Sequence, residues 1–353
     1  MLLYIHIPFC DSKCSYCAFN SYVDKFAQRE KYMHALSLQL TYEFKRFDVS
    51  ETNLIETVFI GGGTPSTVDP HLYSNIFQTI RPFLKPNAEI TSEANPNSAT
   101  YEWLEGMYAL GVNRISFGVQ SFNDTKLKIL GRAHNTTHAL EAIKNAHEIG
   151  FQRLSLDLIY GVKGDTKELL TNDLEQAFSL PIDHLSLYAL TIEEHTAFEK
   201  TPELAREEIE MTEWLFEQIE SRGFEQYEIS NFGTTKSAHN LGYWKGKDYI
   251  GLGAGAVGFL KNTRFYPSTD IEHYISNPLE ITEELLDENA LLGEKLFLGF
   301  RSCVGVEAAL LSPKQKSEAD LLVNETILEY QHGRYFNPNF LLADEIALRV
   351  EGY

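Results

Sequence analysis

Three of the four cysteines lie between positions 10 and 17, at Cys10, Cys14 and Cys17. Their C-x3-C-x2-C spacing allows one short loop to hold three thiolates around a single inorganic core, and it disfavours the alternative that they are only small buried apolar side chains. Soft sulfur ligands favour zinc, copper(I) or an iron–sulfur cluster over hard cations. Structural zinc and four-iron clusters normally have four protein ligands. With three local thiolates, a four-iron cube would keep one iron open for a small molecule.

The composition fits one large domain with an appendage, or two domains. The chain has 353 residues, of which 43% are hydrophobic and 23% charged. We expect no membrane span and a cytoplasmic location, because no apolar run reaches eighteen residues and the N-terminus lacks a signal-peptide pattern. Three clustered cysteines are typical of metal ligation in a reducing compartment, and Cys303, far away in the sequence, is expected to be a small buried side chain. The net charge of −20 disfavours nucleic acid as a partner.

Strand-like and helix-like segments alternate through the first two thirds of the chain. Apolar or β-branched runs occur at residues 2–7, 57–60, 89–92, 114–119, 154–159 and 184–190. Segments with helical spacing lie at 24–46, 70–83, 101–110, 136–149, 167–178 and 202–221. Six such units predict βα repeats and a parallel sheet of the α/β class. The periodicity alone leaves open whether that sheet is a partial barrel or a doubly wound layer.

The pattern changes after about residue 222. Residues 223–232 indicate one more strand, and residues 248–260 are rich in glycine. A long helix is predicted at 281–300, followed by shorter helices and a hairpin around 332–336. We therefore expect a core domain at 1–232 and a smaller domain of mixed α/β structure at 233–353.

The cysteine loop resembles the cluster loop of radical S-adenosylmethionine (SAM) enzymes, and residues 4–10 look like the oxygen-independent coproporphyrinogen III oxidase branch of that superfamily. The resemblance implies a partial (β/α)6 barrel with its site at the carboxyl ends of the strands. It also implies a [4Fe-4S] cluster on Cys10, Cys14 and Cys17, with SAM on the open iron. In that superfamily, one-electron reduction of SAM releases a 5′-deoxyadenosyl radical, a chemistry that belongs to the cofactor.

Further matches follow the predicted strands. The glycines at 61–63 allow close approach of backbone to a ligand, although a tight turn would need them too. By resemblance, SAM is expected to contact Tyr4, Gly62, Gly63, Thr64, Glu93, Gln120, Arg132 and Asp157. Any one of these could instead be a capping residue or an ion-pair partner, but their shared position at strand ends supports the interpretation.

The second informative stretch is His-Asn-Leu-Gly-Tyr-Trp at 239–244. A histidine beside aromatic rings offers haem an axial nitrogen and flat faces, although most single histidines are not ligands. The stretch resembles the H-N-x-x-Y-W motif of the HemW haem chaperones, another branch of the same superfamily. That resemblance makes His239, Asn240, Tyr243 and Trp244 the candidate haem-binding residues. The oxidase branch carries an N-terminal extension and a fourth cysteine, where this chain has Phe19.

Three functional hypotheses follow. The HemW resemblance implies a cytoplasmic chaperone that binds haem, a [4Fe-4S] cluster and SAM, and that delivers haem to recipient haemoproteins. These recipients are expected to be respiratory and in some cases at the membrane. The resemblance leaves open whether the protein is a homodimer. The oxidase resemblance implies a coproporphyrinogen III dehydrogenase that decarboxylates propionates through the adenosyl radical. A zinc-binding interaction protein is the third, and the six βα units disfavour it. We favour the chaperone, on a scaffold that does not dehydrogenate coproporphyrinogen.

Overall fold

A computed structural model describes residues 1–206 and 208–352. Six parallel strands follow one another in sequence and in space, each hydrogen-bonded to the next. They are β1 (Leu2–Ile7), β2 (Ile55–Gly62), β3 (Leu84–Ala94), β4 (Arg114–Gln120), β5 (Arg153–Tyr160) and β6 (His184–Ala189). The ends of this sheet are different strands that do not pair with each other, so the barrel stays open. The partial (β/α)6 barrel expected from the sequence is confirmed.

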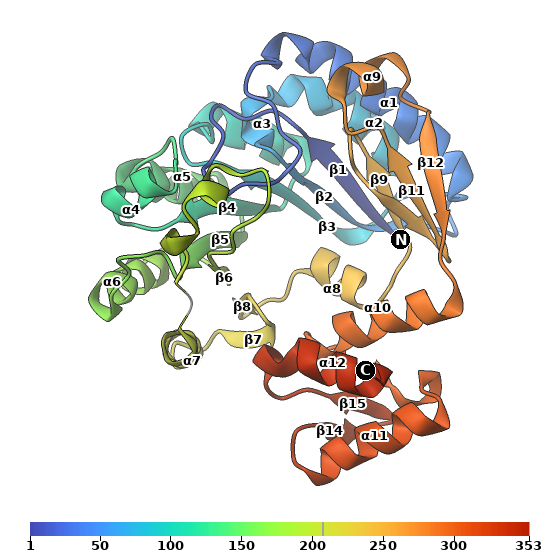
Figure 1. Ribbon diagram of the computed structural model, residues 1–353. Coiled ribbons are helices and arrows are strands. Elements are labelled where there is room, and N and C mark those ends of the chain that lie inside the picture. Colours follow the sequence, from blue (N-terminus) through green and yellow to red (C-terminus); the bar gives the residue numbers. More distant parts are fainter. Residues whose placement is uncertain (207, 353) are drawn as a thin grey trace.

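Helices connect these strands and cover the outer face of the sheet (Figure 1). They are α1 (Arg29–Arg46), α2 (Ser74–Ile80), α3 (Tyr101–Leu110), α4 (Asp124–Ile129), α5 (Thr136–Ile149), α6 (Lys167–Phe178) and α7 (Ile209–Glu220). Capping residues determine where these helices begin and end, as α3 shows. The Thr100 hydroxyl caps the first turn of α3, and Gly111 ends the helix at a φ of 108°. Within the described residues, no helix is long and apolar enough to cross a membrane.

Further strands extend the sheet beyond both ends of the barrel. Two antiparallel strands, β8 (Asn231–Gly233) and β7 (Glu225–Glu228), continue from β6. At the opposite end, β9 (Tyr249–Leu252) pairs in parallel with β1, so β1 lies inside the sheet. Three antiparallel strands follow β9: β10 (Gly258–Leu260), β11 (Thr263–Pro267) and β12 (Ile281–Leu285). The connecting helices are α8 (Ala238–Trp244) and α9 (Ile271–Ser276).

The last part of the chain has a hydrophobic core of its own, with Leu296, Phe300 and Tyr335 among its buried residues. We call residues 288–352 the C-terminal module. Its helices are α10 (Glu288–Phe300), α11 (Pro313–Asn324) and α12 (Ala343–Glu351). A small sheet contains β13 (Val306–Glu307), β14 (Glu329–Gln331) and β15 (Arg334–Phe336). The hairpin predicted around 332–336 is confirmed by the pairing of the last two strands.

Short 3-10 turns complete the described secondary structure. They are η1 (Phe26–Gln28), η2 (Pro65–Thr67), η3 (Pro70–Tyr73), η4 (Arg81–Phe83), η5 (Ala197–Lys200), η6 (Pro202–Leu204), η7 (Ala308–Leu310) and η8 (Phe340–Leu342). Several of them begin segments that the sequence predicts as continuous helix. The segment 70–83, for example, contains η3, α2 and η4 in succession.

Two predictions about the later segments are wrong in detail. Residues 281–300 do not form one helix: the first five pair with β11, and α10 begins only after Asp287, whose carboxylate accepts the Ala290 N–H at 2.8 Å. Residues 223–232 form parts of two strands. The domain boundary after residue 232 stays a prediction. In the structure the main sheet continues to Leu285, and the separate core begins within α10.

Candidate functional site

The cysteine loop follows β1 and crosses the carboxyl ends of the parallel strands. At its ends, the Cys10 N–H donates to the Tyr22 carbonyl at 3.1 Å, and the Tyr22 N–H donates to the Pro8 carbonyl at 2.7 Å. At its middle, the Ser15 N–H donates to the Leu130 carbonyl at 3.1 Å. Backbone hydrogen bonds therefore hold the loop at the mouth of the barrel.

A cavity of about 580 Å³, which we call the loop cavity, lies between this loop and the strand ends. It brings together the three cysteines and seven of the eight residues predicted to contact SAM. These are Cys10, Cys14, Cys17, Gly62, Gly63, Thr64, Glu93, Gln120, Arg132 and Asp157. Tyr4 differs, because it lines a second cavity beside this one.

The cysteines suit a cluster better than a single metal ion. Thr64 Oγ1 donates to Cys10 Sγ at 3.4 Å, and Arg132 Nη1 donates to Cys14 Sγ at 3.2 Å. Such donors stabilise negative charge on sulfur. Among the described residues, no three His, Cys, Asp or Glu side chains are grouped as ligands of one metal ion would be. Structural zinc normally has four protein ligands, whereas three thiolates would leave one iron of a [4Fe-4S] cluster open, so the donor set fits the cluster.

Two carboxyl groups, one from β3 and one from β5, line the loop cavity. The Gly62 N–H donates to Glu93 Oε2 at 3.0 Å. Burial, and then the charge of Asp157, raise the pKa of Glu93 to about 8. Burial also raises the pKa of Asp157 to about 6, against hydrogen bonds that favour its ionised form. A ligand carrying an ammonium or sulfonium group would favour both carboxylates, since a nearby positive charge stabilises the ionised form.

Arg132 ties the cysteine loop to the strands. Its Nη2 donates to Asn95 Oδ1 at 2.5 Å and to the Gly118 carbonyl at 2.6 Å, while Nη1 donates to Tyr16 Oη at 3.4 Å. Next to Gly118, the register of β4 shifts and Gln120 adopts a φ of 69°. Backbone strain of this kind persists where the surroundings over-determine the conformation, as at binding sites.

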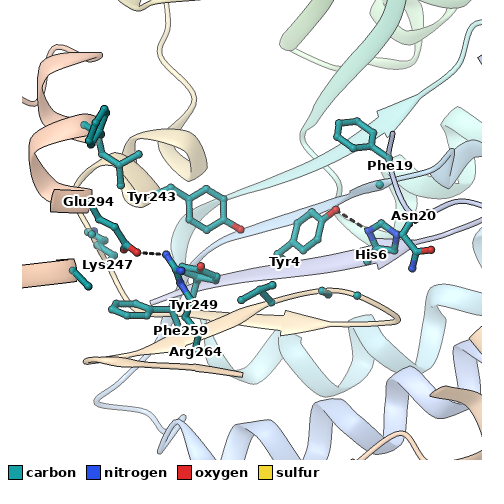
Figure 2. Close-up of a pocket in the computed structure, with 18 of the residues that line it drawn as sticks. Tyr4, His6, Phe19, Asn20, Tyr243, Lys247, Tyr249, Phe259, Arg264 and Glu294 are labelled. Carbon is teal, nitrogen blue, oxygen red and sulfur yellow. Dashed lines mark hydrogen bonds and ion pairs between the residues drawn. The ribbon is translucent and has the colours of Figure 1, made fainter. Parts of the chain in front are cut away.

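The second cavity has a volume of about 1040 Å³, and we call it the aromatic cavity (Figure 2). It lies between β1, α8, the strands β9 to β11 and α10. Its ring-bearing lining residues are Tyr4, His6, Phe19, Tyr243, Tyr249, Phe259 and Phe297. Lys247 and Arg264 also line it, each paired with a carboxylate, Glu56 and Glu294 respectively. The two cavities share Ala18, Phe19, Gly62 and Glu93 as lining residues.

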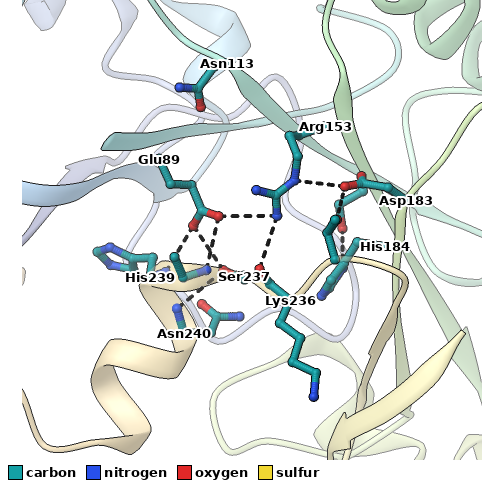
Figure 3. A network of polar contacts seen from close by, with 12 residues as sticks. Glu89, Asn113, Arg153, Asp183, His184, Lys236, Ser237, His239 and Asn240 are labelled. Carbon is teal, nitrogen blue, oxygen red and sulfur yellow. Dashed lines mark hydrogen bonds and ion pairs between the residues drawn. The ribbon is translucent and has the colours of Figure 1, made fainter. Parts of the chain in front are cut away.

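The 239–244 stretch forms α8, and Glu89 on β3 holds its first turn (Figure 3). The Glu89 carboxylate accepts from the N–H groups of Ala238 and His239 at 3.1 and 3.0 Å. Arg153 lies 3.4 Å from Glu89 and 2.8 Å from Asp183. A carboxylate here is favourable because the N-terminus of a helix carries partial positive charge. The network fixes the helix against the inner face of the sheet.

The four candidate haem-binding residues have different surroundings, and Tyr243 alone among them lines a described cavity. His239 is fully buried, its Nδ1 lies 2.7 Å from Thr57 Oγ1, and burial lowers its pKa to about 3. Its Nε2 has no hydrogen-bond partner within the described part of the chain. Tyr243, whose ring centroid lies 4.7 Å from that of His239, lines the aromatic cavity. Trp244 packs against Tyr227, with ring centroids 5.6 Å apart, and Asn240 is half-buried; neither lines a described cavity.

The model of the Radical SAM superfamily matches residues 4–177. Heme chaperone HemW of Bacillus subtilis (strain 168) is 35% identical over 335 residues, which cover 90% of this chain and 87% of that protein. Heme chaperone HemW of Escherichia coli (strain K12) is 39% identical over 265 residues, covering 72% and 69%. The chain belongs to the HemW family of radical SAM proteins.

A vertebrate protein is also similar to this chain. The mitochondrial radical S-adenosyl methionine domain-containing protein 1 of Danio rerio is 33% identical, covering 98% of this chain and 82% of that protein. Among solved structures, coproporphyrinogen III oxidase (HemN) from Escherichia coli has a TM-score of 0.82 and covers 100% of this chain and 90% of that one. With 19% identity, this likeness shows the fold alone.

Sequence reasoning missed most of the aromatic cavity in this HemW-family chain. Tyr249, Phe259, Arg264 and Phe297 come from three strands and a helix, and no common motif connects them. Among its lining residues, the sequence predicts Tyr4, Gly62 and Glu93 as SAM contacts and Tyr243 as a haem contact. In the loop cavity, Asn95 was also missed, although its position directly after β3 was a usable signal.

Proposed function

We propose that this protein is a haem chaperone: it binds haem, carries a SAM-coordinated [4Fe-4S] cluster, and delivers haem to recipient haemoproteins, chiefly respiratory ones. The observation that carries the proposal is the aromatic cavity, because the H-N-x-x-Y-W stretch contributes Tyr243 to its wall. Its volume and aromatic lining suit a large planar ligand. The names of the HemW relatives support haem as that ligand.

The loop cavity is the proposed cofactor site. Cys10, Cys14 and Cys17 would hold the cluster, which when bound supplies an electron and an open iron for SAM. The chain's own groups would then orient SAM: Gly62 and Gly63 by close backbone approach, and Glu93 and Asp157 by their charge. Thr64, Gln120 and Arg132 provide further polar contacts. Tyr4 faces the aromatic cavity, so its proposed contact with SAM has less support than the others.

His239 remains the proposed axial ligand of the haem iron, provided that its enclosed Nε2 atom becomes accessible. Thr57 engages Nδ1, so Nε2 is the nitrogen left for iron. Because this atom is enclosed, the first turn of α8 would have to move away from Glu89 to expose it. Tyr243 needs no such movement and would contact the porphyrin directly.

The test compares haem binding with porphyrinogen chemistry in one preparation. The reconstituted wild type should bind haem with a saturable Soret change, and it should form no protoporphyrinogen IX from coproporphyrinogen III with reductant and SAM. His239→Ala should change the position of the Soret band if this residue ligates the iron. Efficient formation of protoporphyrinogen IX would contradict the proposal and favour the dehydrogenase. The cytoplasmic location, the membrane-associated recipients and a homodimer belong to the same proposal and need separate tests.

A further inference from the structure

Phe19 is an exposed ring on a fixed backbone. Its side chain is 66% exposed, and no other phenylalanine in the described part of the chain is as accessible. The backbone on either side is held: Lys13 Nζ donates to the Phe19 carbonyl at 2.7 Å, and Asn20 Nδ2 donates to the Ala254 and Thr269 carbonyls at 3.0 and 2.9 Å. Hydrogen bonds therefore hold the loop around Phe19 in place, while its apolar ring stays exposed and packs into no core.

The ring stands at the boundary between the two cavities. Phe19 lines both of them, and it follows the cluster ligand candidate Cys17 by two residues. Figure 2 shows the ring above Tyr4, His6 and Asn20, on the side of the aromatic cavity formed by the cysteine loop. His6 Nε2 lies 2.8 Å from the Asn20 carbonyl, which joins this part of the loop to β1.

We propose that Phe19 is the stacking platform for the porphyrin in the aromatic cavity, so that bound haem lies with one face or edge against the cysteine loop. This rests on the proposed haem-binding function. Aromatic rings prefer offset-stacked or edge-to-face contact with other π-systems, and an exposed ring gains both apolar burial and this contact from a planar ligand. Tyr243 supplies ring surface on the α8 side of the same cavity.

The placement has two consequences. A ring at this position gives the cysteine loop a direct contact with the larger ligand. It also places that ligand next to Gly62 and Glu93, which the loop cavity shares. Haem and SAM would therefore be neighbours separated by the loop itself.

The experiment measures haem affinity by Soret titration for the cluster-loaded wild type, Phe19→Leu and Phe19→Trp. We expect Phe19→Leu to bind haem about five- to tenfold more weakly, because a stacking contact of this kind is worth roughly a tenfold change, while Phe19→Trp binds at least as tightly as wild type. The band positions should stay unchanged, since the iron ligands are the same. The matched control is Tyr101→Leu, an aromatic residue that is 43% exposed on α3 and lines neither cavity. Iron content and SAM affinity, measured on each variant, should match wild type.

The outcomes separate this inference from the proposed function. If the wild type binds haem and Phe19→Leu binds it equally well, the stacking role is wrong and the chaperone proposal stands. If Phe19→Leu loses SAM affinity and keeps haem affinity, the ring serves the loop cavity and the inference is overturned. If the wild type binds no haem, both are overturned.

Discussion

At the scale of single residues, the loop cavity is organised by two carboxyl groups that resist ionisation. Glu93 and Asp157 come from different strands, and burial raises the pKa of both. Burying these carboxylates costs free energy, and a positively charged ligand bound beside them would offset that cost by stabilising their ionised forms. Their protonation should therefore appear in the stability of the protein without cofactors.

We expect Glu93→Gln to flatten the pH dependence of unfolding. The folded pKa of Glu93 is about 8, above its ordinary value of 4.5, so between these values the unfolded chain releases a proton that the folded chain keeps. Stability from this group is consequently present at low pH and declines as pH rises toward 8. Urea unfolding of the cluster-free protein should show Glu93→Gln gaining about 2 kcal/mol relative to wild type between pH 5.5 and 7.5. Parallel curves for the two proteins would contradict the shifted pKa.

The sequence predicted the loop cavity better than the haem residues, for a physical reason. Cys10, Gly62 and Glu93 each lie at the end of a strand, and parallel strands place their carboxyl ends together. His239 carried no such constraint. The motif spacing predicts that His239 and Tyr243 lie one turn apart on the same face of α8, but it does not show that Thr57 and the sheet enclose His239 while Tyr243 reaches the cavity.

At the scale of elements, α8 depends on a single carboxylate from another part of the chain. The helix has seven residues, too few to be stable by itself, and Glu89 satisfies two of its first N–H groups. The Ser237 hydroxyl caps the same turn by accepting the Asn240 N–H at 3.3 Å. The position of Tyr243 in the aromatic cavity therefore depends on a contact made by β3.

Glu89→Ala should destabilise the protein by about 2 to 4 kcal/mol, because it removes charge-assisted hydrogen bonds and leaves the N–H groups of Ala238 and His239 without their acceptor. Urea unfolding measures the loss. Glu148→Ala, on the surface of α5, is the control and should change stability by less than about 0.5 kcal/mol. An equal effect of the two substitutions would show that Glu89 does not hold the helix.

At the scale of the whole molecule, a buried carboxylate is one of the groups that hold the C-terminal module against the main sheet. Glu228 on β7 pairs with Arg301 at 2.8 Å and also accepts from Asn231 Nδ2 at 2.6 Å. Beside this pair, the Cys303 N–H donates to the Tyr227 carbonyl at 2.8 Å. Cys303 thus lies at the junction and does not line the loop cavity.

Arg301→Ala should loosen this junction. Removing the guanidinium leaves Glu228 buried without its cation, at a cost of about 2 kcal/mol, since Arg301 itself is partly exposed. Hydrogen exchange should increase in residues 288–352 and stay unchanged in the cysteine loop. Adding Glu228→Gln to this variant should recover part of the stability, because the second substitution removes the unpaired charge. Uniform exchange across the chain would show that the module is not held at this point.

The alternating pattern of the first two thirds predicted the six βα units, and the family resemblance added the partial barrel, whereas the later strands were not predictable. Residues 281–285 read Ile-Thr-Glu-Glu-Leu and are mostly exposed, so they lack the apolar alternation that marks a strand. Pairing with β11 decides their conformation. The parallel pairing of β9 with β1 joins segments more than two hundred residues apart, and no local pattern specifies it.

The position of β1 inside the sheet has a consequence for biosynthesis. One edge of β1 pairs with β2, and its other edge pairs with residues 249–252. These residues are synthesised roughly 10 to 50 s after β1 at ordinary rates of translation. Throughout that interval a nascent strand exposes unpaired backbone groups, which can template pairing with other chains. A fragment ending at residue 232 would keep this edge exposed permanently. The strand that leads into the cysteine loop is thus among the first parts of the protein to be made and among the last to be completed.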